Sequence, residues 1–207
     1  PVILFSPEDL KIVKSGPSER RKFLDIELSQ MERLYLYQLT NYNKILIQRN
    51  NLLKQIRFQN NLIDTLEAWD IQLVKYGSEV IKYREKFIKH LGKVCQKIHN
   101  KLTGGKEQIL LEYDRNVGYD SYLTELKKKR QKDLKYFTTT VGPHRDDISF
   151  VVNGIDIRKY GSQGQQRTAA LSLKLAQIQL MREVMKESPI LLLDDVLSEL
   201  DSNRKTY

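Results

Sequence analysis

Hydrophobic side chains recur at helical spacing over two long central stretches of the chain. Between about Leu24 and Ile56 they lie three, four or seven residues apart, which places them on one face of a helix. A second such stretch runs from about Leu62 to Leu102, where Gly77 and Gly92 weaken the pattern and favour a division into two helices. The two stretches meet around residues 57–61, so we expect an antiparallel helical arm.

Strands are predicted near both ends of the chain and in its second half. Residues 2–5 and 190–193 are continuous apolar runs, and the second has the composition of a fully buried strand of a parallel sheet. Residues 109–113 are strand-like and follow a break at residues 103–105. The pair Asn153-Gly154 stands between two alternating runs, which is the signature of a tight type I′ hairpin.

Shorter helical segments accompany these elements. Ser6 and Pro7 have the pattern of an N-cap followed by the first helical residue, and a similar start is expected near Ser18. Residues 120–136 have a helical pattern, and a last helix is expected from about Gly164 to Lys186. The mixture of helices and strands predicts an α+β fold.

The charge balance points to an anionic partner. Among 207 residues, 35 Lys and Arg outnumber 26 Asp and Glu, which gives a net charge of +9. Nucleic acid is the commonest anionic partner of so basic a chain. The lone Cys95 excludes an internal disulfide and a cysteine zinc cluster and fits a reducing, cytoplasmic location. No apolar run reaches about 18 residues, so no membrane span or membrane partner is expected. The chain starts without Met inside a strand pattern, as a piece of a longer protein would.

Two aspartates follow the apolar run of residues 190–193. Asp194 and Asp195 stand at the carboxyl end of the predicted strand, where open α/β sheets bind their ligands. Apolar residues that end in an acid pair form the Walker B pattern of ATPases. Asp194 would then hold Mg²⁺ through water, and Asp195 would polarise the attacking water as the catalytic residue. The alternative is an ordinary buried strand that ends in a solvated turn.

Two neighbouring motifs strengthen the ATPase interpretation. A Gly/Gln-rich loop, Ser162-Gln163-Gly164-Gln165, opens the last helix, and helix N-termini present backbone N–H groups to anions. Ser198 and Asp201 lie just after the acid pair. Signature loop, helix, Walker B strand and D-loop follow in the order of the second half of an ABC-type ATPase head. For the loop alone, the alternative is a plain helix N-terminal turn.

The sequence contains no P-loop to complete such a site. The pattern G-x-x-x-x-G-K-[ST] is absent, because Val94 and Glu107 follow the only Gly-Lys pairs and no upstream glycine is correctly spaced. In an ABC arrangement the signature loop faces ATP held on another subunit. We therefore expect the loop to serve a phosphate that this chain does not itself hold, and no nucleotide to bind to this chain alone.

The run Lys127-Lys128-Lys129-Arg130 is the strongest candidate for contact with DNA phosphates. The alternative is a solvated charged helix face. A second polar group, His144 with Asp146 and Asp147, resembles a metal or phosphodiesterase site. Side chains alternate faces along a strand, so adjacent residues do not converge on one ion, and a turn near the signature loop is favoured. Tyr35, Tyr42 and Trp69 are predicted to be core residues.

Four segments together resemble the RecF family of bacterial recombination mediators: "VILFSPEDLKIVKSGPSERRKFLD", "VGPHRDD", "SQGQQR" and "LLLDDVLSELD". The resemblance extends from residue 2 to about residue 205. It implies a two-lobed head that binds ATP with Mg²⁺, forms an ATP-dependent homodimer and recognises duplex DNA at gaps or single-strand/double-strand junctions. It also implies work with RecR and RecO to load RecA. Gln163 stands where ABC signatures have glycine, and Asp195 stands where they have glutamate.

The resemblance implies a division of the chain and a role for each motif. Residues 15–137 would form a helical lobe II, inserted into a partial ATPase lobe I made of residues 1–14 and 138–207, without the P-loop half. Residues 162–165 would meet the γ-phosphate of the facing subunit, and Ser198 and Asp201 would lie at the dimer interface. Two alternatives remain: a module that binds RecR or DNA without nucleotide, and a metal-dependent nuclease that uses His144 and the Asp pair.

Overall fold

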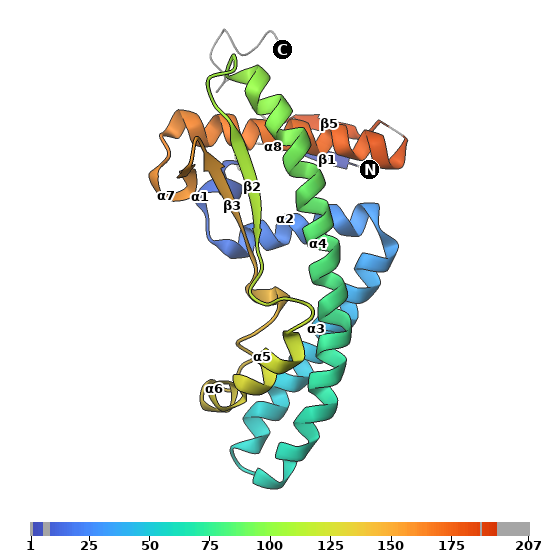
Figure 1. Cartoon of the computed structure of the whole chain (residues 1–207). Coiled ribbons are helices and arrows are strands. Elements are labelled where there is room, and N and C mark those ends of the chain that lie inside the picture. The colour runs from blue at the N-terminus through green and yellow to red at the C-terminus, as the bar shows by residue number, and fades with distance from the viewer. Residues whose placement is uncertain (1, 6–8, 187, 194–207) are drawn as a thin grey trace. The chain divides into compact units, whose positions relative to one another are not determined.

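The computed structural model describes residues 2–5, 9–186 and 188–193. Their elements follow one another in this order: β1 (Val2–Phe5), α1 (Leu10–Lys14), α2 (Pro17–Met31), α3 (Arg33–Ile56), the 3₁₀ helix η2 (Asn60–Thr65), α4 (Leu66–Leu102), β2 (Ile109–Asp114), α5 (Tyr122–Lys128), α6 (Arg130–Tyr136), the 3₁₀ helix η3 (Pro143–Arg145), β3 (Asp147–Val152), β4 (Ile155–Asp156), α7 (Ile157–Tyr160), α8 (Gln163–Met185) and β5 (Ile190–Leu193) (Figure 1). The predicted α+β class is confirmed.

The chain forms two compact units, each of which is described by itself. Unit 1 contains residues 1–24, 86–113 and 148–207, and unit 2 contains residues 25–85 and 114–147. These boundaries cut through α2, α4, β2 and β3, so compactness divides the chain differently from the predicted boundaries of lobe II at residues 15 and 137. The lobe assignment stays a prediction. Within the described residues, no helix is both long enough and apolar enough to cross a bilayer.

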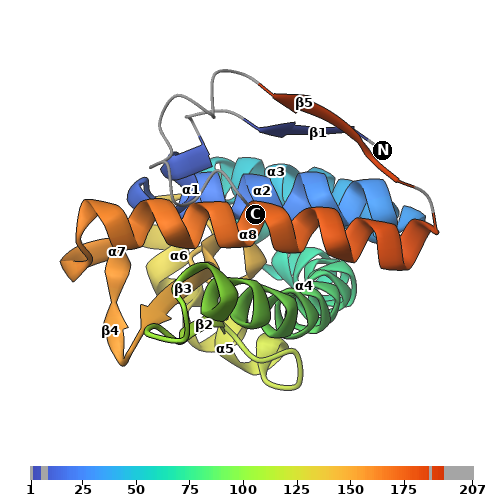
Figure 2. The same cartoon turned by 90° about the horizontal axis from the view of Figure 1, so that it is seen from above.

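Unit 1 holds two small sheets and the long helix α8. Strands β1 and β5 pair in parallel, from Val2 with Ile190 to Phe5 with Leu193, and α8 lies alongside them (Figure 2). Strands β2, β3 and β4 form the second sheet in that order. The predicted tight turn between β3 and β4 is confirmed, because Asn153 and Gly154 have φ values of 49° and 82°, the left-handed pair that a type I′ turn requires.

The prediction that residues 190–193 form a fully buried strand is wrong for two side chains. Ile190 is 63% exposed and Leu192 is 50% exposed. A parallel strand is buried on both faces only when layers cover both sides of its sheet. Within the described residues this sheet has two strands, and these two side chains remain open to solvent.

Unit 2 is built on the antiparallel pairing of α3 with the first half of α4. Arg49 of α3 bonds to Asp70 near the start of α4, whereas Tyr35 bonds to Arg84, further along α4. The expected helical arm therefore forms. The pattern that began at Leu24 is divided between two helices, because the backbone of Glu32 is extended at φ −135° and ψ 102°.

Helix α4 runs without interruption through Gly77 and Gly92, contrary to the predicted division. A Cβ on Gly77 would lie 2.6 Å from the ring of Tyr122 and 2.9 Å from that of Tyr42. The glycine thus makes room for two buried tyrosines, and this packing outweighs its low helix propensity. The prediction that Tyr35 and Tyr42 are core residues is confirmed by exposures of 0% and 1%.

Unit 2 has a hydrophobic cluster where α3 ends and α4 begins. Trp69, which was predicted to be a core residue, is half-buried there and packs against the buried side chains of Leu52, Leu53, Ile56 and Leu66. The predicted helix at residues 120–136 is divided at Lys129 into α5 and α6. Leu134 of α6 packs on the same cluster, which anchors the short helix to the arm.

Candidate functional site

The Gly/Gln-rich loop forms the capped N-terminus of α8, as the sequence predicts. Ser162 is the N-cap residue, and its Oγ accepts a hydrogen bond from the backbone N–H of Gln165 at 3.2 Å. The side-chain oxygen of Gln165 accepts one in return from the backbone N–H of Ser162 at 3.1 Å. This reciprocal pair is a capping box, which fixes the residue at which the helix begins.

The start of α8 has the features that favour an anion. Ser162, Gln163 and Gly164 are exposed, and the first turn contains no acidic residue. The amides of Gln163 and Gly164 belong to that first turn, so the helix offers them no carbonyl acceptor. The 23-residue helix adds the partial positive charge of its dipole. Exposed amides at the positive end of a helix can hold a phosphate.

Gly161, directly before the loop, and Gly164, within it, are surrounded differently. A Cβ on Gly161 would lie 2.6 Å from Cβ of Ile157 and 2.7 Å from its carbonyl oxygen, so the first residue of α7 excludes a side chain there. A Cβ on Gly164 would meet only Ser162 Oγ, at 3.9 Å. Packing within the described residues therefore requires Gly161, whereas Gly164 leaves the surface beside Ser162 uncovered.

Side chains from another part of unit 1 form hydrogen bonds that hold the loop. Gln165 Nε2 donates to Glu107 Oε1 at 3.3 Å, and Glu107 Oε2 lies 3.1 Å from Nε2 of the buried His99. Gln166 is also buried and donates to the carbonyl of Ile157 at 2.8 Å. Sequence reasoning missed His99 and Glu107, because no local pattern connects them to a loop so far along the chain.

The predicted Walker B and D-loop residues lie outside the described part of the chain. These residues are Asp194, Asp195, Ser198 and Asp201. Strand β5 ends at Leu193, directly before the acid pair, and is paired in parallel with Phe5 at that end. In residues 2–5, 9–186 and 188–193, no three acidic, histidine or cysteine side chains gather as a metal site would require.

The basic run at residues 127–130 is largely occupied by ion pairs within unit 2. Lys127 pairs with Glu67 at 2.7 Å, Lys128 pairs with Glu125 at 2.8 Å, and Arg130 pairs with the buried Asp70 at 2.8 Å. The hydrogen bond and charge of Lys127 hold the pKa of Glu67 below its ordinary value.

Only part of this run can be released to a phosphate at low cost. The ion pairs of Lys127 and Lys128 are exposed and screened by solvent, so an anion can displace them. Lys129 is exposed. Arg130 differs, because its partner Asp70 is fully buried and would lose a charge-assisted hydrogen bond.

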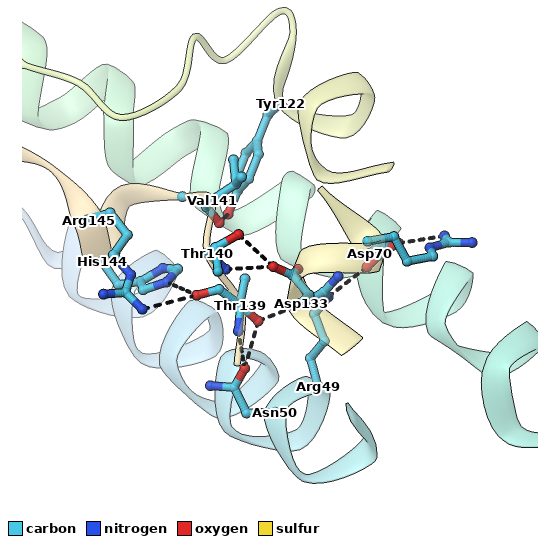
Figure 3. Close-up of polar contacts among 12 residues, drawn as sticks. Arg49, Asn50, Asp70, Tyr122, Asp133, Thr139, Thr140, Val141, His144 and Arg145 are labelled. Carbon is cyan, nitrogen blue, oxygen red and sulfur yellow. Dashed lines mark hydrogen bonds and ion pairs between the residues drawn. The ribbon is translucent and has the colours of Figure 1, made fainter. Parts of the chain in front are cut away.

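Arg130 belongs to the edge of a buried polar network in unit 2. At its centre Arg49, which is fully buried, donates to Asp70 at 2.7 Å, to Asp133 at 2.8 Å and to Thr139 at 2.9 Å. Asp133 also accepts from the backbone N–H and hydroxyl of Thr140. The network thereby ties residues 139–140 to α3, α4 and α6 (Figure 3).

His144 and Asp146 of "GPHRDD" bond to different partners. His144 bonds to the hydroxyl of Tyr42 at 2.6 Å through Nδ1 and to the carbonyl of Thr139 at 2.9 Å through Nε2. Asp146 accepts from the backbone N–H of Asn116 at 2.7 Å and lies 3.5 Å from Arg84. The geometry does not favour the nuclease alternative, since His144 and Asp146 face different partners. That this turn lies near the signature loop stays a prediction.

Curated relatives match this chain along almost its whole length. It is 57% identical over 204 residues to the DNA replication and repair protein RecF of Lachnoclostridium phytofermentans, and 54% identical over 206 residues to that of Agathobacter rectalis. These alignments cover 99% and 100% of this chain and 57% of each relative. No family model matches the chain. Its relatives are thus proteins of DNA replication and repair.

Solved structures give the same result. The structure of the recombination mediator protein RecF-ATP in the RecFOR pathway superposes on all of this chain with a TM-score of 0.95 at 41% identity, and that of RecF-ATPrS superposes with 0.93. Both matches cover 58% of the solved chain. The chain belongs to the RecF family, and it spans a little more than half the length of the relatives it matches.

Proposed function

We propose that this chain supplies the signature loop, Walker B strand and D-loop of a RecF-type ATPase, and that its loop closes on the phosphate of ATP bound by a facing subunit. One observation carries the proposal: the residues that open the capped helix α8 are exposed, at a motif that matches the signature position of ABC-type ATPases. A solved relative at 41% identity is a complex with ATP.

The chemistry we propose is electrostatic positioning of a phosphoryl group. Ser162, Gln163, Gly164 and Gln165 hold the terminal phosphate, chiefly through the backbone amides at the start of α8. Asp194 holds Mg²⁺ through water, and Asp195 orients the attacking water. Ser198 and Asp201 lie at the interface of the ATP-dependent homodimer.

The biological setting follows from the family. We propose that the intact protein is cytoplasmic, binds duplex DNA at gaps or single-strand/double-strand junctions, and acts with RecR and RecO in loading RecA. The exposed lysines at positions 127–129 are the candidates for contact with DNA phosphates. The alternative, a module that binds RecR or DNA without nucleotide, would keep those contacts when ATP is absent.

The decisive experiment is Ser162→Arg in the intact protein. The arginine side chain blocks the close approach of the first-turn amides to a phosphate, so ATP-driven dimerisation is lost while each monomer still binds ATP. Sedimentation with and without ATP, beside titration with a fluorescent ATP analogue, measures both properties. A normal ATP-induced dimer would refute the role of the loop, and lost binding in the monomer would show that the loop acts within one subunit.

The present chain supplies a control for that titration. Because its sequence has no P-loop, we expect it not to bind the ATP analogue by itself. Micromolar binding to this chain alone would show that it holds nucleotide in some other way, and the assignment of the loop to a facing subunit would have to be abandoned.

A further inference from the structure

A chain of hydrogen bonds leads from a fully buried histidine to the loop before α8. His99, in the last turn of α4, has 0% exposure. Its Nδ1 lies 2.9 Å from Ser172 Oγ, and its Nε2 lies 3.1 Å from Glu107 Oε2. The other oxygen of Glu107 accepts from Gln165 Nε2, and the side-chain oxygen of Gln165 caps the N–H of Ser162. All five residues belong to unit 1.

Glu107 is fixed on the side away from the loop as well. Its backbone N–H donates to Thr103 Oγ1 at 3.3 Å, and the same hydroxyl donates to the carbonyl of His99 at 2.8 Å. The side chain of Glu107 is 23% exposed. The carboxylate is therefore held by the end of α4 and the turn that follows it, and it presents one oxygen to Gln165.

This arrangement explains why position 165 carries glutamine. A capping box accepts either glutamate or glutamine at its third residue, because both supply an oxygen to the N-cap amide. Glutamate has no hydrogen to donate to a second carboxylate, whereas Gln165 uses its oxygen for Ser162 and its NH₂ group for Glu107. The cap alone does not require glutamine, but the contact with Glu107 does.

We propose that Glu107 and His99 are positioning residues for the signature loop. They hold the side-chain amide of Gln165 and thereby fix the Ser162 cap in the geometry that presents the first-turn amides of α8 to a phosphate. The end of α4 sets the position of His99, so the readiness of the loop depends on where that helix ends. This inference rests on the proposed function of the loop and adds the residues that control it.

The first test compares variants of Glu107 in the intact protein. Glu107→Ala removes the acceptor for Gln165 and should raise the ATP concentration for half-maximal dimerisation about 5- to 30-fold, the factor for a loss of roughly 1–2 kcal/mol. ATP binding by the monomer should not change. Glu107→Gln should keep dimerisation near the parental level, because its oxygen accepts from Gln165 and its NH₂ group can donate to His99.

A matched control uses the other histidine–glutamate pair of unit 1. Glu183 of α8 lies 3.6 Å from His90 of α4, but both side chains are about half exposed, and Glu183 lies near the C-terminal end of α8. Glu183→Ala removes a similar pair without touching the loop. It should leave the ATP dependence of dimerisation unchanged.

Exchanging the residues at positions 107 and 165 separates the effect of their hydrogen bond from any direct effect of charge on the phosphate. Gln165→Glu keeps the cap but removes the donor to Glu107, so dimerisation should weaken. Adding Glu107→Gln supplies the donor from the other side and should restore it, whereas direct repulsion of phosphate by the new carboxylate would persist. This exchange also decides the matter if Glu107→Ala fails to fold.

The experiments distinguish failure of the positioning role from failure of the proposed function. If Ser162→Arg abolishes dimerisation while Glu107→Ala leaves it at the parental level, or if the exchange fails to restore it, the positioning role is refuted and the proposed function stands. If Ser162→Arg itself leaves the ATP-induced dimer intact, the proposed function of the loop is refuted, and the positioning role is refuted with it.

Discussion

Replacement of Arg49 by methionine should destabilise unit 2 strongly. Arg49 is fully buried and donates to Asp70, Asp133 and Thr139, and both carboxylates are fully buried too. The two positive charges of Arg49 and Arg130 balance the two negative charges of Asp70 and Asp133. Removal of Arg49 leaves this group with an excess negative charge in a site that water does not reach.

The size of this loss depends on the hydrogen bonds that the two aspartates keep. Breaking a buried ion pair by removal of one partner costs about 3–5 kcal/mol, because the other charge loses its compensation. Asp133 keeps its two bonds from Thr140, and Asp70 keeps that from Arg130, which places the expected loss near the lower end of the range. Asp133→Asn added to Arg49→Met removes the excess charge and should recover part of the loss.

Trp69 makes the measurement specific to unit 2. It is the only tryptophan in the chain and packs on the hydrophobic cluster beside Asp70. Urea unfolding followed by its fluorescence gives the free energy of unfolding for parent and variants. As a control, Lys82→Met breaks the exposed pair with Glu79, which solvent screens, and should leave the free energy of unfolding near the parental value. A loss below about 1 kcal/mol for Arg49→Met would show that solvent screens the network, against the burial argument.

Three further predictions rest on other parts of the structure. Gly142→Ala should lower the free energy of unfolding by roughly 2–5 kcal/mol, because its Cβ would collide with two buried tyrosine hydroxyls and the φ of Gly142 is +137°. The control is Gly16→Ala, whose Cβ would meet nothing within 4 Å, and equal losses in the two variants would contradict the reasoning. Changing Lys127, Lys128 and Lys129 to glutamine in the intact protein should reduce the salt slope of duplex DNA binding by about 0.9 per lost phosphate contact, whereas an unchanged slope would mean a merely solvated face. Burial raises the pKa of Cys95 to about 12, so a thiol reagent at pH 8 should label it only after unfolding, and rapid labelling of the native chain would exclude that burial.

The features that sequence predicted well are those decided within a few residues. The start of α8 depends on bonds between Ser162 and Gln165, three positions apart, and the hairpin depends on the left-handed conformations of Asn153 and Gly154. Such local patterns carry their own geometry, so their position in the fold does not alter them. The long amphipathic stretches likewise identified the arm, although not the break at Glu32.

The features that sequence missed depend on which helices meet. The continuity of α4 through Gly77 follows from the tyrosines packed against it, and helix propensity contains no information about them. The basic run was interpreted as one surface, but Asp70 and Glu67 of α4 pair with two of its members. The register between α4 and the helices α5 and α6 determines those pairs, and periodicity along one helix does not specify it.

Two of the four segments that carried the family resemblance differ in how their polar groups are satisfied, and this difference indicates which one acts on a ligand. In "GPHRDD", the backbone N–H of Gly142 bonds to Asn116, and both nitrogens of His144 have partners within unit 2. Substitution there should therefore act through folding. In "SQGQ", Ser162 and Gln165 cap each other, and the capped helix start leaves the remaining first-turn amides at an exposed surface where packing does not require Gly164 to be glycine. A Gly164→Ala variant should thus retain the parental free energy of unfolding to within about 1 kcal/mol, the cost of a side chain that meets no clash. If it nevertheless weakens ATP-driven dimerisation of the intact protein, the glycine serves an approaching phosphate; if stability falls instead, its role lies in the fold.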